Sequence, residues 1–203
     1  IAGGWHALHL HASEGAHEKY LRVGDQTVEG DYSQAAFFFV ANVLGSTIEL
    51  TNLNPKSVQG DKKIVEITEQ MCYNLKEGLP ACFSVDASDI PDLVPILAVL
   101  ATFGTAPSRI TGAHRLAIKE SDRLSSTAAM LNALGGDVTA TEDGLEIRPV
   151  SELHGGTVDS CGDHRIAMCA AVAATRCTGA VTILHGECVE KSYPQFYEDY
   201  RQL

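Results

Sequence analysis

The stretch FSVDASDIPDLVPILAVLATFGTAPSRITGA, residues 83–113, decides the fold predicted for this chain. It runs from a short β-like segment through an acidic loop into an apolar helix, and then through a turn into a β-branched strand. Pro91 stands at the start of the expected helix, where its missing N–H costs nothing, and Gly104 follows the helix. Strands that alternate with helices in this order are typical of an α/β domain.

This pattern occurs three times in the chain. The other copies are TVEGDYSQAAFFFVANVLGSTIELTNL, residues 27–53, and GTVDSCGDHRIAMCAAVAATRCTGAVTILHG, residues 156–186. The expected helices have almost no polar face, which predicts that they pack together inside, with the sheets outside them. In each copy an aspartate precedes the helix and a glycine follows it: Asp31 and Gly45, Asp92 and Gly104, Asp163 and Gly179.

A second, more polar helix is expected after each copy, at residues 62–75, 121–134 and 193–201. Apolar residues at helical spacing between Leu124 and Leu134 support the middle one. The stretch DVTATEDGLEIRP that follows predicts a β-hairpin with its turn at Asp143-Gly144. The predicted unit is therefore strand, helix, strand, helix, with extra strands.

Composition limits the function classes. The 203 residues are 45% hydrophobic and 20% charged, as in an ordinary globular protein, and six cysteines without a CxxC pair predict reduced, buried thiols in a cytoplasmic protein. The longest apolar run, residues 35–44, is too short to span a bilayer, so we expect no membrane association. The net charge of −11 argues against nucleic-acid binding.

Residues 1–27 lack the repeat and hold four histidines, of which His6, His9 and His11 are closely spaced. The spacing is open to two interpretations, a metal site or an exposed strand that carries imidazoles. We favour the strand, because no cysteine or acidic partner stands at metal-ligand spacing nearby.

The segment LAIKESDRL, residues 116–124, contains closely spaced charges. Lys119 and Arg123 are four residues apart, which predicts that they share one helical face, and Glu120 lies beside them. One interpretation is a helix N-terminus capped by Ser121 or Asp122 with surface ion pairs. The other is an anion site next to a carboxylate, because an arginine grips phosphate or carboxylate with two parallel N–H groups.

The segment SCGDHRIAM, residues 160–168, places Asp163, His164 and Arg165 at the start of an apolar helix. Asp163 is a suitable cap, while the helix N-terminus and Arg165 together favour a bound anion. An arginine beside a buried helix needs an acidic partner or a ligand.

Three carboxylates crowd the start of the helix in residues 86–98: Asp86, Asp89 and Asp92. Mutual repulsion is expected to raise the pKa of at least one of them, as in a catalytic base, although a capped and solvated turn is an equal alternative. Two further segments, EGDYSQAAFF at residues 29–38 and VEKSYPQFYEDY at residues 189–200 with Lys191, are weak signals alone. All these clusters fall at the ends of repeat elements, where such a fold brings them to one rim.

In this order and spacing, EGDYSQAAFF, DIPDLVPILAVLA, LAIKESDRL, GDHRIAM and EKSYPQFYEDY resemble the C-terminal half of the 5-enolpyruvylshikimate-3-phosphate (EPSP) synthase family, from about residue 26 onward. The resemblance implies the enolpyruvyl transferase fold, an inside-out barrel of two lobes built from βαβαββ units. Residues 1–27 would end the other lobe, and residues 28–203 would form the C-terminal lobe of three repeats without its first strand. The family's GNAGT-type loop and its N-terminal Lys- and Arg-containing segment are absent here, so we expect one lobe of a larger, monomeric enzyme.

The resemblance also implies the roles of individual residues. Asp92 matches the base that also binds the shikimate ring, and Glu120 matches the acid that protonates the methylene carbon. The positions that match shikimate-3-phosphate-binding residues are Asp92, Arg115 and Lys119, and those that match phosphoenolpyruvate-binding residues are Arg123, His164, Arg165 and Lys191. No metal or organic cofactor is expected, because phosphoenolpyruvate is already activated.

The implied reaction transfers the enolpyruvyl group of phosphoenolpyruvate to the 5-hydroxyl of shikimate-3-phosphate and releases phosphate. Two alternatives remain open from the residues. The first is the sister transferase that acts on UDP-N-acetylglucosamine, which lacks the KESDR and DHRxAM motifs together. The second is a half-chain that only binds ligand, in line with the expectation that this fragment alone is inactive.

Overall fold

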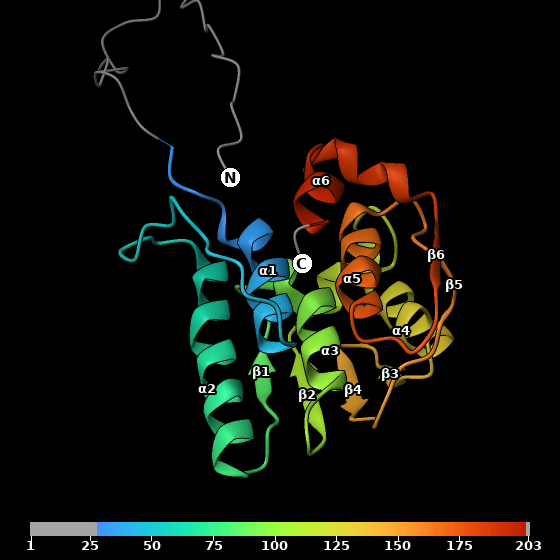
Figure 1. Ribbon diagram of the computed structural model, residues 1–203, viewed down its shortest axis with the longest axis horizontal. Helices are drawn as coiled ribbons and strands as arrows, with labels where there is room; N and C mark the ends of the chain where they lie inside the picture. The colour runs from blue at the N-terminus through green and yellow to red at the C-terminus, as the bar shows by residue number, and fades with distance from the viewer. Residues whose placement is uncertain (1–27, 202–203) are drawn as a thin grey trace, which may run out of the picture.

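The computed structural model describes residues 28–201, so the predictions for the histidines and for residues 1–27 lie outside it. Three apolar helices lie at the centre of the described part and pack against one another (Figure 1). They are α1 (Tyr32–Val43), α3 (Val94–Thr102) and α5 (His164–Ala174). Every residue of α3 is buried, as is every residue of α5 except Ala174. The prediction of three buried helices is confirmed.

The aspartate before α1 and the one before α5 cap these helices. The carboxylate of Asp31 accepts a hydrogen bond from the backbone N–H of Ser33 over 2.7 Å. The carboxylate of Asp163 accepts one from the backbone N–H of Arg165 over 2.9 Å. Both satisfy donors that a helix leaves unpaired at its start. The middle helix begins differently, because the short 3-10 turn η2 (Pro91–Leu93) leads into it.

The middle copy of the repeat builds a four-stranded sheet with strand order β1-β2-β4-β3. Its strands are β1 (Ser84–Asp86), β2 (Ser108–Thr111), β3 (Asp137–Ala140) and β4 (Leu145–Arg148). Strands β1 and β2 are parallel and flank α3, and β3 pairs antiparallel with β4 as the predicted hairpin. Side chains of β4 alternate between buried and exposed, so the sheet has one covered face and one outer face.

The third copy adds a parallel pair, β5 (Gly156–Asp159) and β6 (Val181–Leu184), on either side of α5 in the chain. The strands predicted in the first copy are wrong for its described part, residues 28–53, where no strand forms. The side chain of Asn42 occupies both backbone groups of Ile48, which donates to its Oδ1 and accepts from its Nδ2 over 2.8 Å each. Asn132 makes the same two hydrogen bonds with Val138, which lies in β3, so this contact alone does not account for the missing strands.

The more polar helices surround this core. They are α2 (Lys63–Glu77), α4 (Arg123–Ala133) and α6 (Phe196–Tyr200), with the 3-10 turns η1 (Gly60–Lys62), η3 (His114–Ile118) and η4 (Gly186–Lys191) between them. Asp122 caps α4 by accepting from the N–H of Ser125, so this helix begins later than predicted. Lys119 therefore precedes the helix, and the prediction that it shares a helical face with Arg123 is wrong.

Composition also led to expectations about membrane helices and about the cysteines. No helix among the described residues is long and apolar enough to cross a membrane. The expectation of buried cysteines holds for Cys169 alone, since Cys72 and Cys161 are exposed and the other three are partly exposed. An apolar neighbourhood in the sequence did not bury them: Cys72 lies within α2 but is not among its buried residues, and the other four lie outside the long helices.

Candidate functional site

The N-terminal ends of the three central helices meet at one place, and Arg165 in the first turn of α5 joins them. Its Nη2 atom donates to Ser33 Oγ of α1 over 3.0 Å and lies 3.3 Å from Asp92 Oδ2 of η2. Its Nη1 atom donates to the backbone carbonyl of Asp92 over 3.3 Å. Helix N-termini carry partial positive charge, so three of them and an arginine form a strongly anion-attracting region.

Arg123 in α4 lies behind this junction, with a side chain only 4% exposed. Its Nε donates to Asp163 Oδ2 over 2.7 Å and its Nη1 to Asp92 Oδ1 over 2.9 Å. Burial of the Asp163 carboxyl works to raise its pKa, but the hydrogen bond and charge of Arg123 outweigh burial and hold the pKa below its ordinary value. A guanidinium has five N–H groups and Arg123 uses three on these carboxylates, which leaves two for a ligand.

Glu120 occupies the other side of the site. One of its carboxylate oxygens lies 2.8 Å from His164 Nδ1, and the other accepts a hydrogen bond from Lys191 Nζ in η4. Burial works to raise the pKa of Glu120, but the hydrogen bonds from Lys191 and His164 prevail and lower it. In this arrangement Glu120 is therefore a carboxylate at neutral pH.

The structure thus brings seven of the eight predicted site residues together: Asp92, Lys119, Glu120, Arg123, His164, Arg165 and Lys191. Lys119 is the most distant, with its Nζ 3.9 Å from Asp92 Oδ1. Among residues 28–201, Arg115 forms no hydrogen bond or ion pair with this group; its Nη2 donates instead to the backbone carbonyl of Ser88 over 2.8 Å. The turn η3 leaves Arg115 exposed beside the β1–α3 loop rather than directed at the other cations.

Sequence reasoning missed Ser33 and Asp61 and gave Asp163 only a capping role. The position of Asp163 in the GDHR segment was a usable signal, but Asp61 lies in the short 3-10 turn η1, where the sequence has no periodic pattern. Burial, and then the charge of Asp92, raise the pKa of Asp61 to about 6. Asp86, one of the three carboxylates expected to repel one another, shows the reverse of that prediction, because hydrogen bonds from Ser88 lower its pKa.

One oxygen each of Glu120 and Asp163 and one nitrogen of His164 lie within 4.8 Å of one another, a spacing that suits a metal ion. Arg123 and Lys191 already occupy these carboxylates, however, and a divalent cation would meet both positive charges. Both carboxylates therefore already have a cationic partner within the chain.

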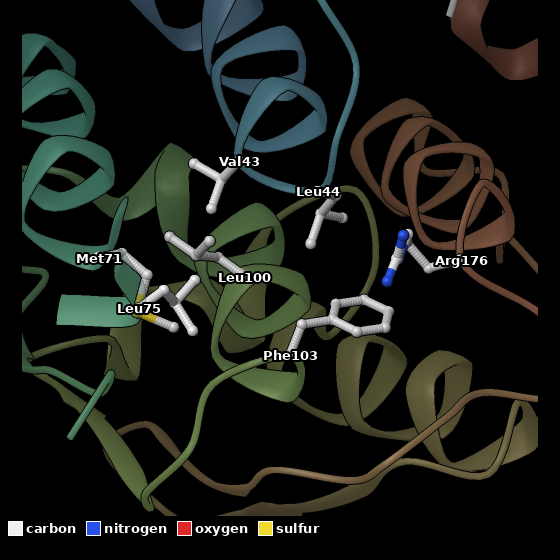
Figure 2. A pocket seen from close by; sticks show the side chains of 7 residues that line it. All are labelled: Val43, Leu44, Met71, Leu75, Leu100, Phe103 and Arg176. Carbon is white, nitrogen blue, oxygen red and sulfur yellow. The ribbon is translucent and has the colours of Figure 1, made fainter. Parts of the chain in front are cut away.

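A pocket of about 210 Å³ lies at the other end of the same helices, where α1, α3 and α5 terminate (Figure 2). Its wall is apolar apart from one cation: Val43, Leu44, Met71, Leu75, Leu100, Phe103 and Arg176. Arg165 and Arg176 therefore mark opposite ends of the α5 segment. The pocket contains no carboxylate or nucleophile, so we place the candidate site at the N-terminal ends.

Comparison with known proteins gives the family. The family model described as EPSP synthase (3-phosphoshikimate 1-carboxyvinyltransferase) matches residues 13–200. The chain belongs to the EPSP synthase family. The match includes every site residue described above and begins upstream of residue 26, where the sequence resemblance was first evident.

Curated relatives agree with this family. A 3-phosphoshikimate 1-carboxyvinyltransferase of Clostridium acetobutylicum is 48% identical over 87% of this chain and 43% of its own length. One from Clostridium kluyveri is 40% identical over 93% of this chain and 48% of its own length. The chain thus spans less than half the length of the curated relatives that it matches.

Solved structures agree as well. An EPSP synthase from Acinetobacter baumannii superposes with a TM-score of 0.70 and 29% identity, over 84% of this chain and 45% of that one. The enolpyruvyl transferase NikO from Streptomyces tendae, at 18% identity and a TM-score of 0.57 over 88% of this chain and 44% of its own, shares the fold.

Proposed function

We propose that this chain is the C-terminal lobe of an enzyme that transfers the enolpyruvyl group of phosphoenolpyruvate to the 5-hydroxyl of shikimate-3-phosphate. The observation that carries the proposal is the cluster in which Arg123 and Arg165 both bond to Asp92 while Glu120 lies between His164 and Lys191. Membership of the family and relatives named 3-phosphoshikimate 1-carboxyvinyltransferase support it.

The proposed chemistry needs one base, one acid and fixed cations. Asp92 would accept the proton of the 5-hydroxyl as its oxygen attacks C2 of phosphoenolpyruvate, and Glu120 would deliver a proton to C3. The resulting tetrahedral intermediate would lose phosphate by cleavage of the C2–O bond, while Glu120 takes a proton back from C3. Cations at fixed positions stabilise the anionic groups throughout. We assign phosphoenolpyruvate to Arg123, Arg165, Lys191 and His164, and the phosphate of shikimate-3-phosphate to Lys119 and Arg115.

The low pKa of Glu120 bears directly on its role as an acid. A carboxylate without a proton cannot donate one, and the hydrogen bond from Lys191 is the largest of the effects that keep this pKa down. An anion that binds Lys191 would draw that ammonium away and so raise the proton affinity of Glu120. Substrate binding would thereby raise the pKa of Glu120. This residue would then hold a transferable proton only when the site is loaded.

We further propose that the 203 residues alone do not catalyse this reaction. The relatives are more than twice as long as their matched part, so a second lobe would face this cluster and supply further contacts with both substrates. The expected cytoplasmic location and monomeric state belong to that larger protein.

The experiment is steady-state turnover of the full-length protein with phosphoenolpyruvate and shikimate-3-phosphate. We expect phosphate release with shikimate-3-phosphate and none with UDP-N-acetylglucosamine in its place. Phosphate release with the nucleotide sugar would instead support enolpyruvyl transfer to UDP-N-acetylglucosamine. No phosphate release with either acceptor would favour the alternative that the protein only binds its ligands.

A further inference from the structure

The segment EGDYSQAAFF supplies Ser33 to the candidate site, but its first two residues have no part in the proposed chemistry. Glu29 and Gly30 lie instead against the loop of residues 52–59. The backbone N–H of Gly30 donates to the carbonyl of Asn52 over 2.8 Å. A Cβ on Gly30 would meet that oxygen at 2.7 Å, so a glycine is needed for the two backbones to lie this close. The start of α1 and this loop are therefore in direct contact.

The carboxylate of Glu29 accepts hydrogen bonds from several side chains of that loop. Its Oε1 accepts from Ser57 Oγ and from Gln59 Nε2, the latter over 2.8 Å, and its Oε2 accepts from Asn54 Nδ2 over 2.7 Å. These bonds, that from Ser57 above all, lower the pKa of Glu29, so the group is a carboxylate at neutral pH. A carboxylate can only accept, and Gln59 must therefore present Nε2 rather than Oε1 to Glu29.

This orientation of the Gln59 amide lets it hold the start of α1. With Nε2 turned to Glu29, Oε1 accepts a hydrogen bond from the backbone N–H of Tyr32 over 2.9 Å. The Nε2 group also donates to the backbone carbonyl of Gly30 over 3.0 Å. The N–H of Tyr32 is one of the donors that a helix leaves unpaired at its start. One amide side chain thus uses its oxygen and its nitrogen to fix the first turn of α1.

The first turn of α1 in turn holds Arg165. Ser33 directly follows Tyr32 and is buried, and its Oγ accepts a hydrogen bond from Arg165 Nη2 over 3.0 Å. The same nitrogen lies 3.3 Å from Asp92 Oδ2. If Ser33 moved away, Asp92 would be the remaining partner of that nitrogen among the described residues and would draw the guanidinium toward itself. The position of Ser33 therefore decides how Arg165 faces a ligand.

We propose that Gln59, oriented by Glu29, is a positioning residue for Arg165 and thereby for phosphoenolpyruvate. This inference rests on the proposed function, because it takes phosphoenolpyruvate as the anion that Arg165 holds. Each step of the connection is a hydrogen bond or a peptide bond, in the order Glu29, Gln59, Tyr32, Ser33 and Arg165. The residues assigned to the phosphate of shikimate-3-phosphate are not part of this connection, so the effect should be specific to phosphoenolpyruvate.

The experiment measures kcat and the KM of each substrate for the full-length parent and for Gln59→Ala. We expect KM for phosphoenolpyruvate to rise about threefold to tenfold, the factor that a typical hydrogen bond contributes. Both kcat and KM for shikimate-3-phosphate should stay within about twofold of the parent, as for a loss of uniform binding of one substrate. A residue that only stabilises the fold gives another result, because partial unfolding lowers the active fraction, and so kcat, without changing KM.

The matched control is Asn42→Ala at the other end of α1. Asn42 also holds a neighbouring segment through its amide, which bonds to both backbone groups of Ile48 over 2.8 Å each. Its loss should lower Tm about as much as Gln59→Ala does and leave KM for phosphoenolpyruvate at the parent value.

Glu29 is tested by comparing two variants. Glu29→Ala removes the acceptor that orients the Gln59 amide and should raise KM for phosphoenolpyruvate in the same way. Glu29→Gln keeps an oxygen that can accept from Gln59 Nε2 and should restore most of the parent value. Residues that act as one unit have non-additive effects, so Glu29→Ala should change KM little further in the Gln59→Ala background. A double variant whose KM rises by the product of the two single effects would refute the role given to Glu29.

A parent-like KM for phosphoenolpyruvate in folded Gln59→Ala, or an equal rise in the KM of both substrates, overturns the inference. Gln59→Leu, which removes the same hydrogen bonds but keeps most of the side-chain volume, replaces the first variant if that one does not fold. A parent that binds phosphoenolpyruvate in calorimetry without turnover refutes the proposed reaction alone, and the variants are then compared by Kd. A parent that does not bind phosphoenolpyruvate refutes both.

Discussion

The Nε atom of Arg123 donates a hydrogen bond to Oδ2 of Asp163 over 2.7 Å, across 40 positions of sequence. The side chain of Asp163 is fully buried and that of Arg123 almost so, which makes this pair the inner wall of the candidate site. It connects the start of α4 to the cap of α5. The same connection brings together Glu120, three residues before Arg123, and His164, which follows Asp163.

Replacement of Arg123 by methionine should destabilise the protein strongly. The variant leaves the buried carboxylate of Asp163 without its cation, a change that typically costs about 3–5 kcal/mol. The control is Arg109→Met, whose pair with Glu146 is 3.9 Å long and exposed, and should cost no more than about 1 kcal/mol. Thermal or urea unfolding of the full-length protein measures both. Equal losses in the two variants would show that the buried pair is not a stabilising contact.

Acid should weaken the contribution of Asp163. Its pKa is lowered in the folded state, so its stabilising effect is present above its ordinary pKa of 3.8 and is lost as pH falls below that value. We expect Asp163→Asn to melt well below the parent at neutral pH, with a gap that narrows in acid. The exposed Asp137, paired with Arg148 at 3.4 Å, supplies the control Asp137→Asn. A gap that stays constant from neutral pH to strong acid would contradict this account.

Glu120→Gln tests the proposed acid. Glutamine keeps the size of the side chain but carries no transferable proton, so turnover of the full-length protein should fall roughly 10²–10⁴-fold. The cations Arg123, Arg165 and Lys191 remain, and phosphoenolpyruvate binding should change little. If Glu120 were only the partner of Lys191, whose side chain is 63% exposed, the pair would be worth about 0–1 kcal/mol and turnover would stay near normal. Steady-state kinetics of the folded variant separates the two outcomes.

Gly60→Ala should disturb the site without touching a charge. The new methyl group would meet the backbone carbonyl of Asp89 at 2.5 Å, and the segment before Asp92 would have to shift. Overpacking of this kind costs about 1–3 kcal/mol, and we expect a rise in KM as well. Lys56→Ala, at an exposed position of the same loop, is the control and should leave both values unchanged. A stable Gly60→Ala variant with normal KM would show that η1 moves freely.

The three central helices and the hairpin followed from local chemistry. An apolar run of about ten residues after an aspartate buries nearly every side chain and satisfies its own backbone, wherever it lies in the chain. The Asp143-Gly144 turn likewise places β3 beside β4 without help from distant residues. The order of the charged segments was sufficient to identify the family.

The pairing of the charges was decided by tertiary structure. Arg115 and Lys119 are neighbours in sequence, yet only Lys119 approaches Asp92, because η3 turns Arg115 toward Ser88. The raised pKa of Asp61 comes from burial and from charges brought to it by other elements. Charge interactions act through space over a few ångströms, so they depend on how the elements pack, whereas the period of an apolar run is a property of the sequence itself.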